Sequence, residues 1–200
     1  MKKVVLAALV TSASFQAVGS EYVSDGWYIG ADVIGTTFEA EGSDSSPSST
    51  SGAIAVGYDF KLSDSVVLGI EAEYADYGKF DFVVEDYQND VYSLDIKALS
   101  FYAKPKYFVK ESSFYFGVLA GISFYSAERE VTVSNVDFWG YTIDEVTYRD
   151  NETQNETEFV YGLEAGYAFN SHLLLNVGYR MGDLKNYEHD TWYAGLDYKF

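Results

Sequence analysis

The strongest constraint on the fold is a strict alternation of two kinds of residue along short segments of the chain. In the last ten residues one face carries large apolar side chains and the other carries polar or small ones: Trp192, Ala194, Leu196, Tyr198 and Phe200 against Thr191, Tyr193, Gly195, Asp197 and Lys199. A period of two is typical of a β-strand whose faces meet different environments. The chain end is therefore expected to be a two-faced strand.

Seven earlier segments follow the same rule, which predicts eight strands in all. They cover residues 27–33, 53–60, 68–74, 99–107, 114–125, 159–169 and 173–182. Only Asn170, Ser171 and His172 separate the last two of these, which indicates a tight hairpin. The pattern predicts an all-β fold, an eight-stranded antiparallel up-and-down barrel.

Two places depart from the pattern. Leu94, Ile96 and Ala98 have the opposite parity to Leu99 and the residues that follow it. This change predicts a bulge, or a strand emerging from the membrane. Pro105 cannot donate to a ladder, so it is expected near the end of the barrel that has short turns, or at a bulge.

The N-terminus indicates export. Met1, Lys2 and Lys3 precede a short apolar run, and small residues follow near Gly19 and Ser20. This arrangement predicts a signal peptide over residues 1–20 and a mature barrel domain over residues 21–200. No cysteine is available for a disulfide, and no later segment reaches the roughly 18 apolar residues of a membrane helix. Any membrane crossing must therefore use strands.

The chemistry of the two faces favours a membrane barrel over a soluble barrel or sandwich. The polar face is rich in Gly, Ala and Ser with few charges, which suits a narrow crowded lumen. The apolar face places aromatic residues near strand ends, as at Trp27, Tyr74 and Trp192. Connections at 61–65, 109–113 and 170–172 are short, whereas those near 36–51, 76–93, 126–157 and 183–190 are expected to be mostly long outer loops.

The charge excludes nucleic acid as a partner. The formal net charge is −18, and removing two lysines with the signal peptide makes it −18 − 2 = −20. Such a surface repels phosphates and favours basic surface partners or divalent cations. Acidic residues are concentrated between Glu128 and Glu158, but without the spacing of an EF-hand, so a solvated loop is favoured over a specific calcium site.

The whole mature length resembles the small outer-membrane β-barrel family of OmpA, OmpX and opacity type. The alternating C-terminal residues Leu196, Tyr198 and Phe200 resemble the signal by which the barrel-assembly machinery recognises that family. The resemblance implies an outer-membrane location, contact with outer-membrane lipid and lipopolysaccharide, and no cofactor. OmpA itself adds a periplasmic domain that binds peptidoglycan, so anchoring to the cell wall is not implied here.

Charged residues on the polar face are expected to line the lumen. They are Asp32, Glu71, Glu73, Lys104, Lys106, Glu164, Arg180, Asp197 and Lys199. Strand pairing predicts that the two glutamates of the third strand face the two lysines of the fourth, and that Glu164 lies diagonal to Arg180. A structural network that fills the lumen is favoured over an ion path or gate.

These observations favour a non-enzymatic barrel that supports envelope integrity and presents acidic outer loops. The alternatives are a narrow ion or small-solute channel and, less favoured, a lipid-modifying enzyme. The sequence offers few catalytic residues, because His189 is the sole plausible general base and no serine stands out as a nucleophile to pair with it. Metal ligation by a His/Cys cluster is not expected either, and no catalytic, cofactor or metal residue is assigned.

Overall fold

The computed structural model describes residues 22–40, 48–84, 90–138, 141–184 and 187–200. The signal peptide expected over residues 1–20 lies outside the described residues. The division of the chain at residue 20 therefore stays a prediction.

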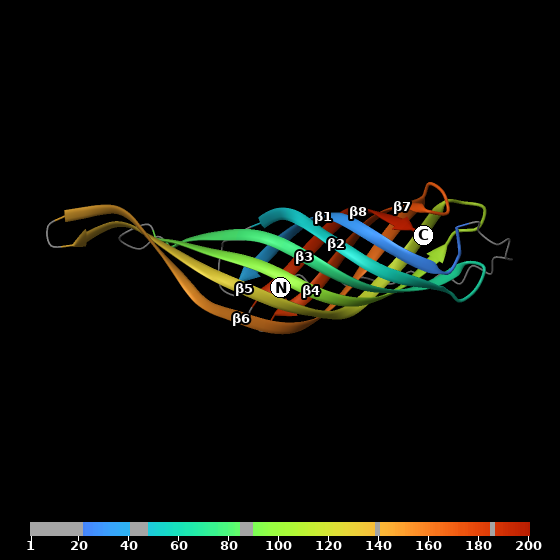
Figure 1. Cartoon of the computed structure of the whole chain (residues 1–200), viewed down its shortest axis with the longest axis horizontal. Coiled ribbons are helices and arrows are strands. Elements are labelled where there is room, and N and C mark those ends of the chain that lie inside the picture. The colour runs from blue at the N-terminus through green and yellow to red at the C-terminus, as the bar shows by residue number, and fades with distance from the viewer. Residues whose placement is uncertain (1–21, 41–47, 85–89, 139–140, 185–186) are drawn as a thin grey trace.

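The architecture is a closed antiparallel barrel in which each strand pairs with the next and β8 pairs with β1 (Figure 1). Alternating segments form all of its strands, so the predicted fold is confirmed. The strands are β1 (Gly26–Ala40), β2 (Ser48–Lys61), β3 (Val66–Val84), β4 (Asp90–Phe108), β5 (Phe114–Phe138), β6 (Tyr141–Ala168), β7 (Leu173–Leu184) and β8 (Tyr187–Lys199).

The outer surface of the barrel is apolar. Trp27 is 61% exposed, Phe159 is 61% exposed and Phe200 is 69% exposed, and aliphatic residues such as Ile54 and Leu163 fill the band between the aromatic ones. A continuous exposed band of this kind is stable against lipid rather than water. In the part of the chain that the structure describes, no helix is long and apolar enough to cross a membrane.

The two ends of the barrel differ strongly. At one end, short turns join Lys61 to Val66, Phe108 to Phe114 and Ala168 to Leu173, as expected. At the other end the expectation of long loops is largely wrong, because most of residues 36–51, 76–93, 126–157 and 183–190 continue as paired strand. The backbone groups there are satisfied by cross-strand hydrogen bonds, which explains why strand continues beyond the barrel wall.

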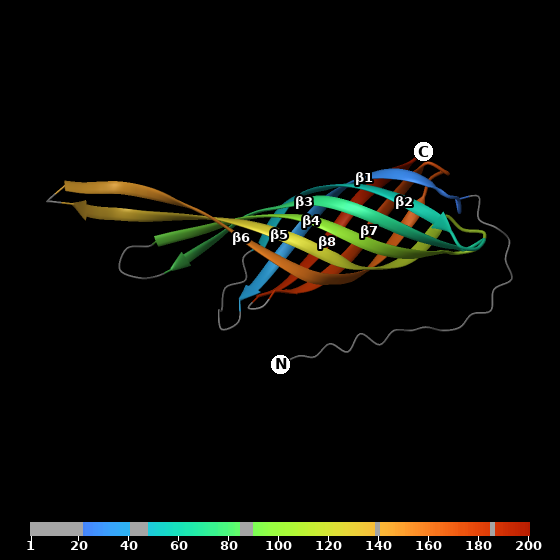
Figure 2. The same ribbon diagram turned by 60° about the horizontal axis from the view of Figure 1, so that its bottom comes forward.

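The strands β3 to β6 form a sheet that projects beyond the other four. The hairpin of β5 and β6 extends furthest, and the hairpin of β3 and β4 projects beside it (Figures 1 and 2). Their pairing continues to Phe138↔Tyr141 and to Val84↔Asp90. We call this part of β3–β6, residues 78–84, 90–95, 128–138 and 141–157, the projecting sheet.

The parity change before Leu99 has a different cause from the ones expected. Ile96 and Ala98 are buried inside the barrel, and β4 runs through them without a shift. The bulge lies instead on the neighbouring strand β3, between Asp76 and Gly78, opposite Ile96. Gly78 has φ = 80°, which explains glycine at this position.

Pro105 lies where the sequence predicted, three residues before β4 ends at Phe108 near the short turns. Its side chain is exposed on the outer face. No backbone partner on β5 is assigned to Pro105, which fits a residue that lacks an N–H.

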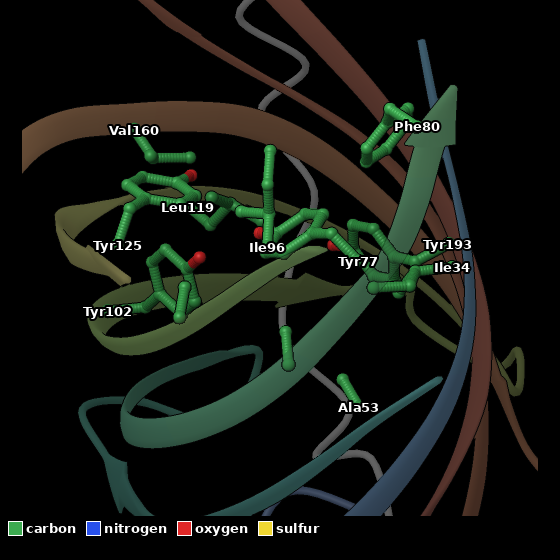
Figure 3. Close-up of a cluster of buried hydrophobic side chains, with 12 residues drawn as sticks. Ile34, Ala53, Tyr77, Phe80, Ile96, Tyr102, Leu119, Tyr125, Val160 and Tyr193 are labelled. Carbon is green, nitrogen blue, oxygen red and sulfur yellow. The ribbon is translucent and has the colours of Figure 1, made fainter. Parts of the chain in front are cut away.

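Apolar side chains close the lumen at two levels. One cluster, towards the projecting sheet, includes Tyr77, Ile96, Leu119, Tyr125 and Val160, whose side chains gather inside the barrel (Figure 3). The other cluster lies at the short-turn end and consists of Val23, Val67, Phe108, Tyr115, Ala168 and Leu174. The buried charged side chains, such as Glu71, Lys104 and Glu164, form a layer between these two clusters.

Candidate functional site

The lumen holds the charged residues that the sequence singled out. Asp32 is half-buried, and the other eight are buried. The buried ones are Glu71, Glu73, Lys104, Lys106, Glu164, Arg180, Asp197 and Lys199. All nine occupy inward-facing positions of the strand alternation. Charges held this deeply require partners, because an isolated buried charge is costly.

Lys104 lies at the centre of this layer. Its Nζ is 3.1 Å from Glu71 Oε2 and 2.9 Å from Glu164 Oε2, so it joins β3 to β6 across the lumen. The Glu71–Lys104 contact is among those expected from strand pairing. Glu164 lies diagonal to Arg180 in the register, as predicted, but its ion pair is with Lys104.

Two other expected pairings also differ. Arg180 on β7 donates from Nη1 to both oxygens of Glu73, at 2.7 and 2.9 Å, across the barrel. Lys106 lies 3.4 Å from Asp59 on β2 and not beside Glu73. These pairs join strands that are not neighbours, so adjacent-strand register could not predict them.

Asp59 is a lumenal acid that the sequence reasoning left out of its set. Its Oδ1 contacts Lys106, and its Oδ2 is 3.0 Å from Lys199 on β8. The alternation of β2 had placed it on the polar face, and that signal was sufficient to include it. Glu158, which was assigned to an outer loop, is also buried, at 5% exposure.

Tyrosines complete the network with their hydroxyl groups. Tyr28 donates to Glu71 Oε2 at 2.8 Å, while Tyr115 and Tyr193 donate to the two oxygens of Glu164 at 3.0 and 2.9 Å. Each carboxylate therefore accepts hydrogen bonds in addition to its ion pair. These bonds link carboxylates on β3 and β6 to tyrosines on β1, β5 and β8, and a network of this kind rigidifies the interior.

The rings of these tyrosines lie against glycines on the adjacent strand. Tyr28 is opposite Gly57, Tyr115 is opposite Gly166, and Tyr193 is opposite Gly178. A Cβ added to any of these glycines would come within 2.2–2.3 Å of the ring. Missing side chains in the wall thus make room for aromatic rings in the lumen.

The C-terminal strand presents two different faces. Leu196, Tyr198 and Phe200 are exposed on the outside, whereas Asp197 and Lys199 point into the lumen. The Phe200 N–H donates to the Trp27 carbonyl at 2.9 Å, and the Lys199 ammonium donates to the Ser24 carbonyl. The last strand is thereby tied to the chain segment that begins β1.

The two histidines lie on different elements of the fold. His189 lies in β8 opposite Phe38 and Gly182, but its side chain is outside the described residues. His172 is exposed in a short turn, where its Nδ1 lies 2.9 Å from the Ser171 hydroxyl. Among the side chains that the structure describes, no three His, Cys, Asp or Glu residues gather as a metal site.

The projecting sheet has open edges. Pairing between β6 and β7 stops at Val160↔Gly182, so within the described part of the chain residues 141–157 of β6 have β5 as their one paired neighbour. On the other side, pairing between β2 and β3 stops at Gly52↔Asp76, and among the described strands residues 81–84 have β4 as their one paired neighbour. Open edges of this kind are templates for an additional strand.

Comparison with known proteins agrees with this geometry. A family model described as "Outer membrane protein beta-barrel domain" matches residues 4–200. No curated protein sequence matches the chain.

Two solved structures have the same fold. The first is Ail, the attachment invasion locus protein of Yersinia pestis, in complex with the heparin analogue sucrose octasulfate; it is 17% identical, with a TM-score of 0.56, and the match covers 88% of this chain and 99% of Ail. The second is Neisserial surface protein A, which is 18% identical, with a TM-score of 0.53 and coverage of 92% and 100%. The chain is an outer-membrane protein, and it belongs to the outer membrane protein β-barrel domain family.

Proposed function

We propose that this protein is a non-enzymatic barrel that contributes to envelope integrity and uses its projecting sheet to bind basic partners at the cell surface. The observation that carries the proposal is the edge of β6 over residues 141–157, which lies beyond the barrel wall and, among the described strands, pairs with β5 on one side and with no strand on the other. Unpaired N–H and C=O groups there accept a strand from a partner.

Charge supports a basic partner. Residues 126–157 contain eight acids, Glu128, Glu130, Asp137, Asp144, Glu145, Asp150, Glu152 and Glu156, against Arg129 and Arg149. The Ail complex contains a polyanion. The acidic projecting sheet would repel such a ligand, so we expect its partners to carry the opposite charge.

The filled lumen argues against the channel alternative. The ion pairs of Lys104 and Arg180 cross the barrel, and an apolar cluster lies on either side of the charged layer. An eight-stranded barrel has an interior only wide enough for its side chains. We therefore assign the lumen to stability and surface recognition to the projecting sheet.

Binding by a trimmed variant tests this function. Replacing residues 132–147 with Asn-Gly connects Val131 to Tyr148, its partner in the register, through a two-residue turn and shortens the hairpin. In nanodiscs, the intact protein should bind basic polypeptides with an affinity that falls as salt rises, and the trimmed variant, which lacks three of the eight acids and part of the β6 edge, should bind them more weakly. Equal binding by both proteins would contradict the proposal.

Envelope integrity requires a separate test in cells. A strain lacking the protein should become sensitive to detergent, and both the intact and the trimmed protein should restore resistance, because the barrel is unchanged. If neither protein restores resistance, the envelope role is wrong. Lipid A mass spectra that change between wild type and His189→Ala would instead support the lipid-modifying alternative.

The outward face of β8 supports recognition by the barrel-assembly machinery. Leu196, Tyr198 and Phe200 lie exposed on it. We expect Phe200→Ala to lower the amount of folded barrel in cells while refolding in detergent proceeds as in wild type. An equal loss of folding in both settings would mean that Phe200 acts only in packing against the wall.

A further inference from the structure

We propose that Asp32, Asn176 and Asp197 bind one divalent cation, such as Ca²⁺, inside the barrel at the seam where the first and last strands meet. The three residues come from β1, β7 and β8. The bound ion would tie together the strands that close the barrel. This inference is independent of the role proposed for the projecting sheet.

The first step is a balance of lumenal charges. Each lumenal base already has an acidic partner: Lys104 contacts Glu71 and Glu164, Lys106 and Lys199 share Asp59, and Arg180 contacts Glu73. Four bases are thereby matched with four acids. Asp32 and Asp197 remain without an ion pair among the described residues.

The second step concerns unsatisfied atoms. Asp32 Oδ1, Asp197 Oδ2 and Asn176 Oδ1 are all buried without a hydrogen-bond partner within the described part of the chain. Asp197 is 4% exposed and Asn176 is 2% exposed. Buried acceptors of this kind are costly unless something supplies positive charge or a donor.

The third step is proximity. Gly195 on β8 lies opposite Asp32 on β1 and opposite Asn176 on β7, so these two side chains flank it. Asp197 lies two residues further along β8 on the same inward face. Adjacent strands are about 4.8 Å apart, so three inward side chains at these positions are able to reach a common point.

Glycines allow the carboxyl groups to lie against the wall. A Cβ at Gly195 would be 1.6 Å from Asp32 Oδ1, and one at Gly30 would be 2.6 Å from Asp197 Oδ1. Any larger residue at Gly195 would therefore displace the Asp32 carboxylate.

The oxygen atoms define the ligand class. Two carboxylates and one amide are hard oxygen donors, which suit Ca²⁺ or Mg²⁺ with water in the remaining positions. Their combined charge of −2 matches a divalent ion. The site contains only two acids beside the amide, which is consistent with the absence of any three-acid cluster among the described side chains.

Metal content after refolding tests the proposal. The chain is refolded in detergent with Ca²⁺, desalted in EDTA and assayed for calcium by mass spectrometry. A buried ion should survive this wash whereas ions on the acidic surface should not, which predicts about one Ca²⁺ per chain. Asp32→Asn with Asp197→Asn should hold none, and the exposed control Asp64→Asn should retain it.

A stability measurement keeps the test decisive. Calcium should raise the urea midpoint of wild type and of Asp64→Asn but not that of the double variant, whose folding is checked by heat-modifiable mobility. If the double variant does not fold, Asn176→Leu replaces it, with the same expected loss of calcium. Wild type that retains no calcium, or a double variant that does retain it, would overturn the proposal. If wild type retains no calcium and the double variant is the more stable of the two without metal, the two aspartates would instead be neutralised by protons.

Discussion

The barrel wall and the projecting sheet are built from the same strands but are stabilised differently. In the wall, Val160 of β6 pairs with both Gly121 of β5 and Gly182 of β7. Beyond the wall, Val146 pairs with Val133 of β5 and, among the described residues, with none on its other side. The wall also encloses a network of ion pairs, and the projecting sheet extends beyond that network.

This difference separates stability from recognition. Lipid offers no hydrogen bonds, so backbone groups in the wall must be paired on both sides. Beyond the membrane, water can hydrogen-bond the N–H and C=O groups at the edge of the projecting sheet. The sequence of the projecting sheet can therefore change without opening the barrel. Changes in the lumen should therefore affect unfolding strongly, and changes in the projecting sheet should affect it little.

The largest effect is expected from breaking a buried ion pair. Arg180→Met leaves the Glu73 carboxylate buried without its cation, which should lower the free energy of unfolding by about 3–5 kcal/mol. Urea unfolding in detergent micelles measures this value. Adding Glu73→Gln should recover much of the loss, and a double variant as unstable as Arg180→Met would show that the charge is not the cause.

A smaller effect is expected where a tyrosine ring lies against glycine. Gly166→Ala places a Cβ about 2.2 Å from the Tyr115 ring, and overpacking of this kind should lower the free energy of unfolding by about 1–3 kcal/mol. Gly52→Ala is the matched control, because its nearest neighbour is the Asp32 carbonyl at 3.4 Å. Equal effects at both positions would argue against the ring contact.

The smallest effect is expected from trimming the projecting sheet. The variant that joins Val131 to Tyr148 removes no contact in the lumen, so its free energy of unfolding should stay within about 0.5 kcal/mol of wild type. Urea unfolding again provides the measurement. A loss comparable to that of Arg180→Met would mean that the projecting sheet supports the wall.

The sequence predicted the barrel but only part of its interior. Alternation at Trp192 to Phe200 determines which side chains face outward, because lipid and lumen impose different chemistry on the two faces. The Glu71–Lys104 contact follows from pairing of adjacent strands. The Arg180–Glu73 contact spans β7 and β3, and such distances across a lumen depend on curvature and stagger that one strand's pattern does not encode.

Two errors have specific physical causes. Polar composition between Glu128 and Glu158 suggested loops, yet paired rows such as Val133↔Val146 continue the strands. The opposite parity of Ile96 and Ala98 suggested a bulge or a strand emerging from the membrane, because a lumen that is polar throughout would leave no inward place for them. The apolar cluster around Tyr77 explains their parity.

Hydrogen exchange of the protein in nanodiscs tests the contrast between wall and projecting sheet most directly. Amides of β6 from 160 to 168 should be protected for long times, because both neighbouring strands pair with this segment. Between 141 and 159, amides directed away from β5 should exchange rapidly while those directed towards β5 exchange more slowly. Uniform protection along β6 would show that its edge is covered, and rapid exchange from 160 to 168 would show that the barrel is not closed there.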